Sequence, residues 1–284
     1  MFGVDNMIME MIRQQSNPPI LLYHYCKKES AKYLLDRAAD IAARSVLKSP
    51  NDTSEYSFGV GLFLDHLHEK RLVPKVIIDL LCRNLIDNLC AAKICRSSII
   101  PFAFCLTDAF NSAYHWDEFA QDGGGYCMVF SRSDLEDKIQ RVVHSGKASL
   151  RLERCYYAGH DDSAISAIVD AICRDRERDF LRLENSNGLD SEAATRIMQQ
   201  ICMFAMCVKQ ERYYLEREWR IVMVSGNSCD ADASGFLNTG IRNYCPRNDI
   251  LYLMRGVLSS PTGDKGKLFS TLSALLDTRK GIAS

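Results

Sequence analysis

The chain has 284 residues, of which 47% are hydrophobic and 25% are charged, and its formal net charge is −1. These proportions are those of an ordinary globular protein, and the near-neutral charge means that any contact with nucleic acid would have to come from a local basic patch. There is no run of about 18 apolar residues, and residues 1–15 lack the features of a secretory signal. We therefore expect a cytoplasmic protein without a membrane segment.

The elements of the first half follow from hydrophobic periodicity and turn residues. They are a strand over 20–26, a helix over 29–46, a turn over 49–54, two helical stretches divided at Pro74, and strands over 99–107 and 126–131. A short aromatic segment and Gly123-Gly124-Gly125 connect the last two strands.

The second half mixes long helices with closely spaced strands. In order, the pattern predicts a strand over 149–158, helices over 161–184 and 191–213, strands over 218–224, 235–244 and 250–254, and a helix over 265–276. This order favours an α+β fold over a doubly wound sheet. We expect a single domain over 1–284, with an N-terminal extension over 1–19 and helical segments over 58–97 and 160–214.

Two carboxylates that stand two residues apart lie at the start of the strand predicted at 218–224. In a strand, alternate side chains share a face, so Glu216, Glu218 and Arg220 are expected on one face and Trp219 on the other. Like charges on one face cost stability unless something uses them. The alternative is a solvated edge strand in which Arg217 and Arg220 are the partners of the two glutamates.

The twelve cysteines do not indicate a metal site. No C-x-x-C pair is present, and the pairs Cys90–Cys95 and Cys202–Cys207 are spaced so that they do not share a helical face. Most of them stand among apolar residues, as free thiols do in the cores of proteins from reducing compartments. We expect reduced core thiols and no bound metal.

Four clusters of polar and aromatic residues follow one another along the chain. They are Leu22-Tyr23-His24-Tyr25; Asn51-Asp52 with Glu55; Phe104-Cys105-Leu106-Thr107 with Trp116, Phe119 and Ala120; and Glu216-Arg217-Glu218-Trp219-Arg220. Each also has a structural interpretation, in which His24 and Trp116 are core residues, Asn51 and Asp52 form a turn, and the glycines form a hairpin connection. The chain contains no P-loop, no G-x-G-x-x-G opening a helix, no H-E-x-x-H and no serine elbow.

Together, the four clusters resemble an uncharacterised prokaryotic family with the pattern L-Y-H-Y, N-D-x-x-E, F-C-hydroxyl, W-x-x-Y-A and E-x-E-W-R. The resemblance runs from about residue 21 to about residue 256, and Phe119 replaces the tyrosine of the pattern. The first strand and helix also resemble the opening of the ADP-ribosyltransferase superfold. That resemblance implies a split β-sheet core with helical insertions and NAD as the substrate.

The resemblance also implies a role for each candidate catalytic residue. Cleavage of the nicotinamide–ribose bond passes through an oxocarbenium-like state, which a carboxylate on the ribose 2′-hydroxyl stabilises. Glu218 is expected in that role, and Glu216 is expected to orient or deprotonate the acceptor. His24 is expected to hydrogen-bond the ribose hydroxyls.

The remaining candidates are expected to bind NAD. Trp116 or Phe119 would stack on the cationic nicotinamide ring, and Tyr25 would form a further wall. Lys209 and Arg220 would meet the pyrophosphate, since no glycine-rich loop is present to do so.

Two functions from different classes remain open at this point. In the first, the chain is an NAD-dependent ADP-ribosyltransferase that modifies a nucleic acid or a protein, as a toxin held by an antitoxin or as an anti-phage defence effector. In the second, it is a non-catalytic binding or scaffold module of the same fold. A plain NAD glycohydrolase lies between the two.

Overall fold

A computed structural model describes residues 19–28, 30, 54–83, 101–120, 124–144, 150–224 and 254–259. Three predicted elements lie outside the described residues. They are the helix at 29–46, of which position 30 alone is described, the strand at 235–244 and the helix at 265–276. Asn51 and Asp52 of the second sequence cluster also lie outside them.

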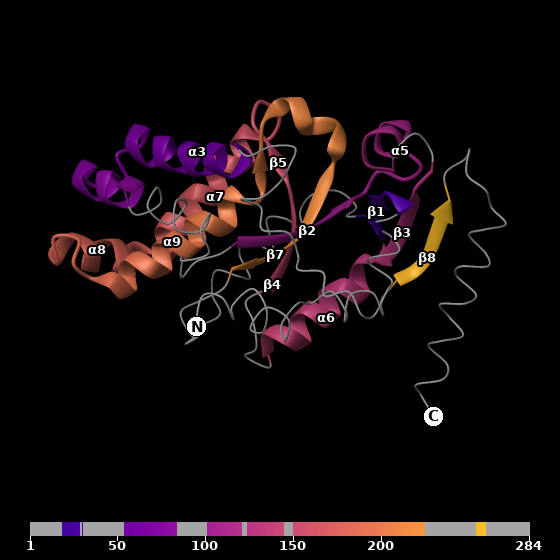
Figure 1. Cartoon of the computed structure of the whole chain (residues 1–284). Helices are drawn as coiled ribbons and strands as arrows, with labels where there is room; N and C mark the ends of the chain where they lie inside the picture. The colour runs from indigo at the N-terminus through magenta and orange to yellow at the C-terminus, as the bar shows by residue number, and fades with distance from the viewer. Residues whose placement is uncertain are drawn as a thin grey trace.

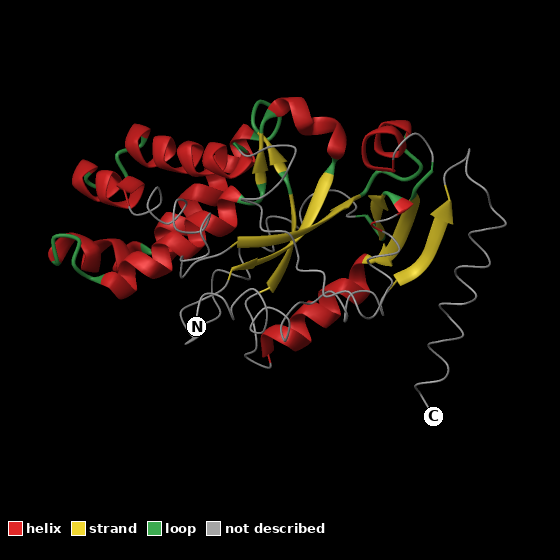
Figure 2. Cartoon of the chain, viewed as in Figure 1, coloured by secondary structure: helices red, strands yellow, loops and turns green. Residues whose placement is uncertain are grey.

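A six-stranded sheet with the order β4-β7-β2-β1-β3-β8 forms the centre of the structure (Figure 2). Its strands are β1 (Leu21–Cys26), β2 (Pro101–Thr107), β3 (Tyr126–Ser131), β4 (Leu150–Arg154), β7 (Glu218–Val224) and β8 (Met254–Ser259). All its neighbouring strands are antiparallel. Two short parallel strands, β5 (Tyr156–Tyr157) and β6 (Val208–Lys209), form a second sheet. Helices and antiparallel strands together confirm the α+β prediction.

The six-stranded sheet is weakly joined at its middle. Strand β2 pairs with β7 at seven positions, and β1 pairs with β3 at six. By contrast, β1 and β2 pair at one position, Tyr23 with Thr107. The sheet therefore consists of two well-paired halves, β4-β7-β2 and β1-β3-β8, that part beyond this single pairing.

Helices cover both faces of the sheet (Figure 1). They are α3 (Glu55–Glu69), α5 (Ala113–Ala120), α6 (Arg132–His144), α7 (Asp162–Asp175), α8 (Glu177–Asn185), α9 (Ser191–Ala205) and the 3₁₀ helix η2 (Glu211–Glu216). Figure 1 shows α3, α7, α8 and α9 gathered at one end, α5 near β1 at the other end, and α6 below the sheet. The side chains of α3, α7, α8 and α9 form one continuous apolar core, which reaches Val222 of β7.

Two glycines permit close contacts in this architecture. A Cβ atom on Gly59 of α3 would lie 2.6 Å from the backbone of Ala205, so glycine lets α3 and α9 approach each other. A Cβ atom on Gly125 would lie 2.3 Å from the carbonyl oxygen of Cys26. The glycines before β3 therefore do more than turn the chain, because Gly125 also packs directly against β1.

Several predicted elements differ from the structure. The helices α5 and α6 occupy segments where none is predicted, and the helix predicted at 161–184 is divided between α7 and α8 near Arg176. The helix predicted at 191–213 ends at Ala205, because the next residues form β6 and η2. The last described strand, β8, begins at Met254, where the prediction ends.

Residues 174–179 alternate in charge, a pattern typical of a solvated helix face, but one residue of this run is buried. Asp179 is buried at 8% exposure and accepts hydrogen bonds from Arg196 of α9, while Arg176 pairs with it from its own turn. Burial is compatible with a charge here because two guanidinium groups neutralise it. Asp179 thus connects α8 to α9.

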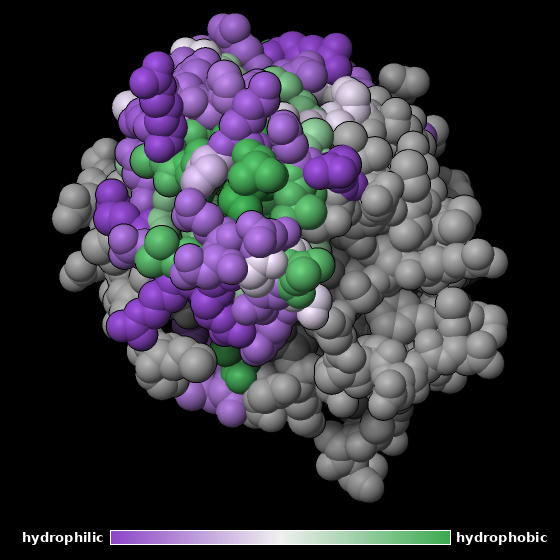
Figure 3. Space-filling model, turned by 90° about the vertical axis from the view of Figure 1, so that its left-hand side faces the viewer, coloured by the Kyte–Doolittle hydropathy of each residue, from purple (hydrophilic) through white to green (hydrophobic). Residues whose placement is uncertain are grey.

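The helical end of the molecule exposes a few apolar side chains. Those with large exposed areas are Leu72, Val76, Leu181 and Leu189. Figure 3, which views the molecule from this end, shows apolar surface interrupted by polar residues.

Candidate functional site

The turn that precedes β7 is strained and firmly held. Arg217 has a φ of 44°, which is uncommon for a residue with a side chain, and it separates Glu216 of η2 from Glu218 of β7. The buried hydroxyl of Thr107 donates to the Glu216 carbonyl at 2.8 Å. Asp108 binds the Arg217 guanidinium at 2.6 Å. The prediction that Glu216 shares a strand face with Glu218 and Arg220 is therefore wrong. Glu216 is instead the last residue of the 3₁₀ helix η2, next to the strand.

Glu218 lies at the centre of a buried cluster of charges. Its carboxylate accepts two hydrogen bonds from Arg220, at 2.9 Å from Nε and 2.8 Å from Nη2, and one from Lys209 Nζ at 2.7 Å. The three side chains are 4–7% exposed, so these contacts are shielded from water. The hydroxyl of Tyr157 accepts a hydrogen bond from the Glu218 backbone N–H at 2.7 Å.

Two further carboxylates share the same cations. Glu216 binds Lys209 Nζ directly, and Glu55, the first residue of α3, binds Arg220 Nη2 and lies 3.8 Å from Lys209 Nζ. We call these five residues, Glu55, Lys209, Glu216, Glu218 and Arg220, the charge cluster. It contains three carboxylates and two cations, so its carboxylates cannot all be fully compensated.

The pKa values of Glu216 and Glu218 are shifted in opposite directions. Burial alone would raise the pKa of Glu218, but Arg220 and Lys209 hold that pKa well below its usual range. Burial raises the pKa of Glu216, Lys209 lowers it, and Glu218 and Glu55 raise it further, so the net shift is upward. Two neighbouring carboxylates with separated proton affinities are the usual arrangement for one permanent charge and one acid or base.

His24 stands where the two halves of the sheet part. The ring is half-buried, its Nδ1 donates to the Cys105 carbonyl at 2.7 Å, and it stacks on Phe104 with a centroid distance of 4.7 Å. This hydrogen bond places the proton of the neutral ring on Nδ1 and leaves Nε2 as an acceptor. Burial lowers the pKa of His24, against the opposing effect of that bond, so the neutral ring is favoured.

Strand register places His24 and Glu218 on opposite faces. Paired residues of antiparallel strands share a face, so the pairs Tyr23–Thr107 and Thr107–Glu218 put these three side chains on one side of the sheet. His24 alternates with Tyr23 and points to the other side. No hydrogen bond or ion pair of the described residues joins His24 to either glutamate.

Cys105 connects the two sides of the sheet. Its carbonyl accepts the hydrogen bond from His24, whereas its side chain lies on the Glu218 face of the sheet, because Cys105 pairs with Arg220. Desolvation and the charge of Glu218 raise the pKa of this thiol, so it remains protonated.

The aromatic candidates form a separate cluster on the Glu218 side of the sheet. Tyr25 of β1 contacts Trp116 of α5 edge-on at 4.9 Å, and Phe119 packs against the same group. We call Tyr23, Tyr25, His115, Trp116 and Phe119 the aromatic cluster. The Tyr25 hydroxyl donates to the Ala109 carbonyl at 3.0 Å, and Trp116 Nε1 donates to Asn111 at 3.0 Å.

A buried histidine joins the aromatic cluster to the charge cluster. His115 is 2% exposed, and its Nε2 donates to the Glu216 carbonyl at 3.0 Å. Its ring lies 5.1 Å from that of Tyr25 and 5.6 Å from that of Phe119. Burial lowers the pKa of His115, so it is a neutral contact between the two clusters.

The cations Lys209 and Arg220 do not occupy positions expected of pyrophosphate ligands. Both are buried and bind carboxylates of the charge cluster, and Arg220 Nη1 also donates to the Met206 carbonyl at 2.5 Å. Their carboxylate partners raise the pKa of each cation, against the lowering effect of burial. A pyrophosphate would have to displace these internal partners, so the direct role of the two cations in pyrophosphate binding stays a prediction that the geometry disfavours.

Sequence reasoning missed three contributors to this region. Glu55 belongs to the N-D-x-x-E cluster, and that spacing was the available signal. His115 stands beside Trp116 in the aromatic segment, where a helical periodicity would have shown that it is buried. Tyr157 carries no sequence signal, because its contact with Glu218 depends on the parallel pairing of β5 with β6.

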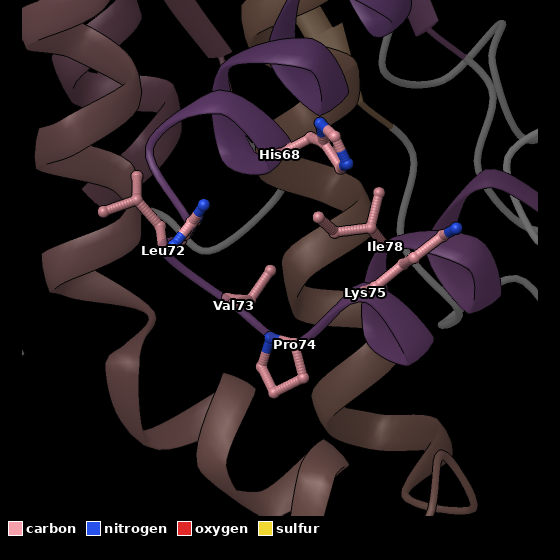
Figure 4. A pocket seen from close by; sticks show the side chains of 7 residues that line it. His68, Leu72, Val73, Pro74, Lys75 and Ile78 are labelled. Atoms are coloured by element: carbon pink, nitrogen blue, oxygen red, sulfur yellow. The ribbon is translucent and has the colours of Figure 1, made fainter.

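A hollow at the end of α3 lies apart from the charge cluster (Figure 4). It is lined by His68, Arg71, Leu72, Val73, Pro74, Lys75 and Ile78. Figure 4 shows the Lys75 side chain extending away from Val73. The lining combines apolar and basic residues and includes none of the residues predicted to be functional.

The described residues also bear on metals and membranes. They contain no group of three or more histidine, cysteine or acidic residues arranged to hold a metal ion, and their eight cysteines are free thiols. None of the helices in the described ranges combines the length and apolar character required to cross a bilayer.

Comparison with known proteins identifies one family model. A model described as "Protein of unknown function (DUF2971)" matches residues 115–221. The matched segment includes Trp116, Phe119 and four members of the charge cluster, but neither His24 nor Glu55. No curated protein and no solved structure matches the chain. The match agrees with the resemblance to an uncharacterised family and provides no evidence on ADP-ribosyltransferases.

Proposed function

We propose that the chain is an NAD-dependent ADP-ribosyltransferase whose chemistry is centred on Glu216 and Glu218. The observation that carries this proposal is the contrast between these two carboxylates, which bind one lysine and have opposite shifts in pKa. Cleavage of a glycosidic bond needs one carboxylate that stays ionised and a second that handles a proton. Glu218 meets the first requirement, and Glu216 meets the second.

The positions of the other residues are consistent with a cationic aromatic substrate. The aromatic cluster lies on the same face as the charge cluster and is attached to Glu216 through His115. A nicotinamide ring carries a positive charge and stacks on aromatic faces, which suits this combination. Phe119, which is partly exposed, would contact the ring directly, whereas Tyr25 and Trp116 are 6% and 5% exposed and would have to rearrange to do so.

The part of His24 in this proposal depends on where the ligand enters. Because His24 and Glu218 point to opposite faces, a molecule that contacts both must lie at the position where β1 and β2 part. Such a position would let Nε2 of His24 accept a hydrogen bond from a ribose hydroxyl. The weak junction between β1 and β2 supports this arrangement, since a single pairing holds the two halves together.

The acceptor is either a nucleic acid or a protein, and the chain would then act as a toxin or as a defence effector, with an antitoxin as its partner. Hydrolysis of NAD without an acceptor is the corresponding alternative. A protein confined to the cytoplasm would meet NAD and both acceptor classes.

A non-catalytic module is a second candidate, and one observation favours it. The oxygens of Glu218 already accept three hydrogen bonds, two from Arg220 and one from Lys209. A carboxylate has about four lone-pair sites, so little capacity remains for a ribose hydroxyl. In this interpretation, the charge cluster connects α3, β6 and β7 and has no chemical role.

Incubation of the purified protein with labelled NAD and cell lysate distinguishes these functions. Label that becomes sensitive to nuclease indicates a nucleic-acid acceptor, and label that becomes sensitive to protease indicates a protein acceptor. Release of free ADP-ribose with no labelled macromolecule indicates a glycohydrolase. Unchanged NAD in every arm, with a Glu216→Gln control that behaves identically, would leave the non-catalytic module as the function.

A further inference from the structure

Glu55 is the member of the charge cluster that has no role in the proposed chemistry. It begins α3, far from β7 in the sequence, and is 6% exposed. A carboxylate is buried to this extent only when it is paired, and both partners of Glu55 are shared with other glutamates.

Arg220 and Lys209 divide their contacts among the three carboxylates. Arg220 Nη2 binds Glu55 and also lies 2.8 Å from Glu218 Oε2. Lys209 Nζ contacts Glu216 and Glu218, and Glu55 lies 3.8 Å away. Without the charge of Glu55, two carboxylates would face two cations, and each would have its own partner.

We propose that Glu55 is a positioning residue that competes for Arg220 and Lys209 and thereby keeps one proton in the charge cluster, on Glu216. The count of buried charges carries this inference, since three carboxylates share two cations and Glu216 is the most exposed of the three, at 14%. Glu216 is also held by the fewest cations, because Lys209 alone contacts it. The proton is therefore bound at the carboxylate nearest to solvent.

Among the described residues, Lys209 is the cation that contacts Glu216. The groups that face it are Lys209 from β6, Glu218 from β7, Glu55 from α3, and Tyr114 and His115 from α5. Tyr114 and His115 are neutral near pH 7, since burial raises the pKa of Tyr114 and lowers that of His115. Glu218 lies closer to Lys209 than Glu55 does, but Glu55 is the competing carboxylate that the proposed chemistry does not use.

This inference rests on the proposed function only for its catalytic consequence, because the proton can be observed without turnover. The experiment is a carbon-13 NMR titration of labelled glutamate carboxyl groups in the wild type and in Glu55→Gln, with the Glu216 signal assigned from Glu216→Gln. We expect the titration midpoint of Glu216 to fall in Glu55→Gln. In Glu69→Gln, which changes an exposed glutamate of the same helix, the midpoint should stay where it is in the wild type.

An unchanged Glu216 midpoint in folded Glu55→Gln would overturn the inference. If Glu55→Gln does not fold, Glu55→Asp is used instead, because its shorter side chain withdraws the carboxylate from Arg220. The titration midpoint of Glu216 should then fall by a smaller amount. An unchanged midpoint again overturns the inference. If the wild type consumes NAD, the acidic limb of its rate profile should move to lower pH in Glu55→Gln, with a gain of about threefold or more on that limb. A lowered midpoint in a protein that does not consume NAD would support the role of Glu55 while rejecting the proposed function.

Discussion

The β7 half of the sheet carries buried charges, whereas the β1 half carries aromatic rings, although both groups lie on the same face. The charge cluster draws its members from α3, β6, η2 and β7, so its geometry depends on four separate elements. The aromatic cluster draws its members from β1 and α5, which are neighbours in space. The charged half is therefore the more sensitive to single changes, because a buried charge without its partner costs more than a lost ring contact.

The largest effect is expected from Glu218→Gln in the charged half. The amide keeps the shape but leaves Arg220 and Lys209 with one carboxylate fewer, so the free energy of unfolding should fall by about 3 kcal/mol or more. Turnover of NAD should fall by at least ~100-fold. The buried ion pairs that Glu218 makes with Arg220 and Lys209 are the reason to expect a lower melting temperature as well. Thermal unfolding and an NAD-consumption assay measure the two effects.

Glu216→Gln is the matched variant, and its effect on stability should have the opposite sign. Folding raises the pKa of Glu216. This residue therefore stabilises the folded state at a pH below its pKa in the unfolded chain, and the stabilisation is lost as the pH rises through its pKa in the folded protein. Its removal should therefore leave stability unchanged in acid and improve it as the pH rises. A pH series of melting temperatures that shows equal losses for the two variants would remove the distinction between the carboxylates.

Thr107→Val tests how the charged half holds its strained turn. Valine keeps the volume but removes the hydroxyl that donates to the Glu216 carbonyl and accepts from the Ala109 N–H at 3.1 Å. We expect a loss of about 1–2 kcal/mol in the free energy of unfolding, because two buried backbone groups lose a partner. Thr195→Val on the exposed side of α9 is the control and should cost less. Equal costs in denaturant unfolding would show that the turn does not depend on Thr107.

Tyr25→Phe makes the corresponding change in the aromatic half. The ring remains, and the bonds to the Ala109 carbonyl and from the Ser112 N–H are lost. The expected cost is about 1 kcal/mol, since one bond is well formed and the other is long at 3.4 Å. Tyr126→Phe on the adjacent strand is the control, because its hydroxyl makes no hydrogen bond with the described residues. A cost for Tyr25→Phe above that of Thr107→Val would reverse the ranking of the two halves.

Sequence patterns predicted local structure better than they predicted which residues meet. The strand over 218–224 and its alternation place Glu218 and Arg220 on one face and Trp219 on the other, as the structure confirms. The same alternation separates His24 from Tyr25, which the shared sequence cluster obscured. The contact of Glu55 with Arg220 could not be predicted, because it joins residues 165 positions apart and depends on how α3 packs on α9. Local periodicity contains no information on such packing.

An effect on stability as small as that of Tyr25→Phe is expected at His24, where the two halves part. His24→Ala removes one hydrogen bond to the Cys105 carbonyl and a stacking contact with Phe104, so the free energy of unfolding should fall by about 1 kcal/mol. His144→Ala on α6 is the matched control, since its exposed ring also bonds a backbone carbonyl, that of Gln140, away from the site.

NAD is the ligand that separates the two possible roles of His24. A ligand that binds only the folded state raises the melting temperature, and with millimolar NAD this rise should shrink or vanish in His24→Ala but persist in His144→Ala. The reason is geometric: His24 is half-buried at the junction of β1 and β2, and its Nε2 is the one polar atom of the ring that the Cys105 carbonyl does not use. A large drop in the ligand-free melting temperature, together with an undiminished rise on addition of NAD, would instead make His24 a structural link between the two halves of the sheet.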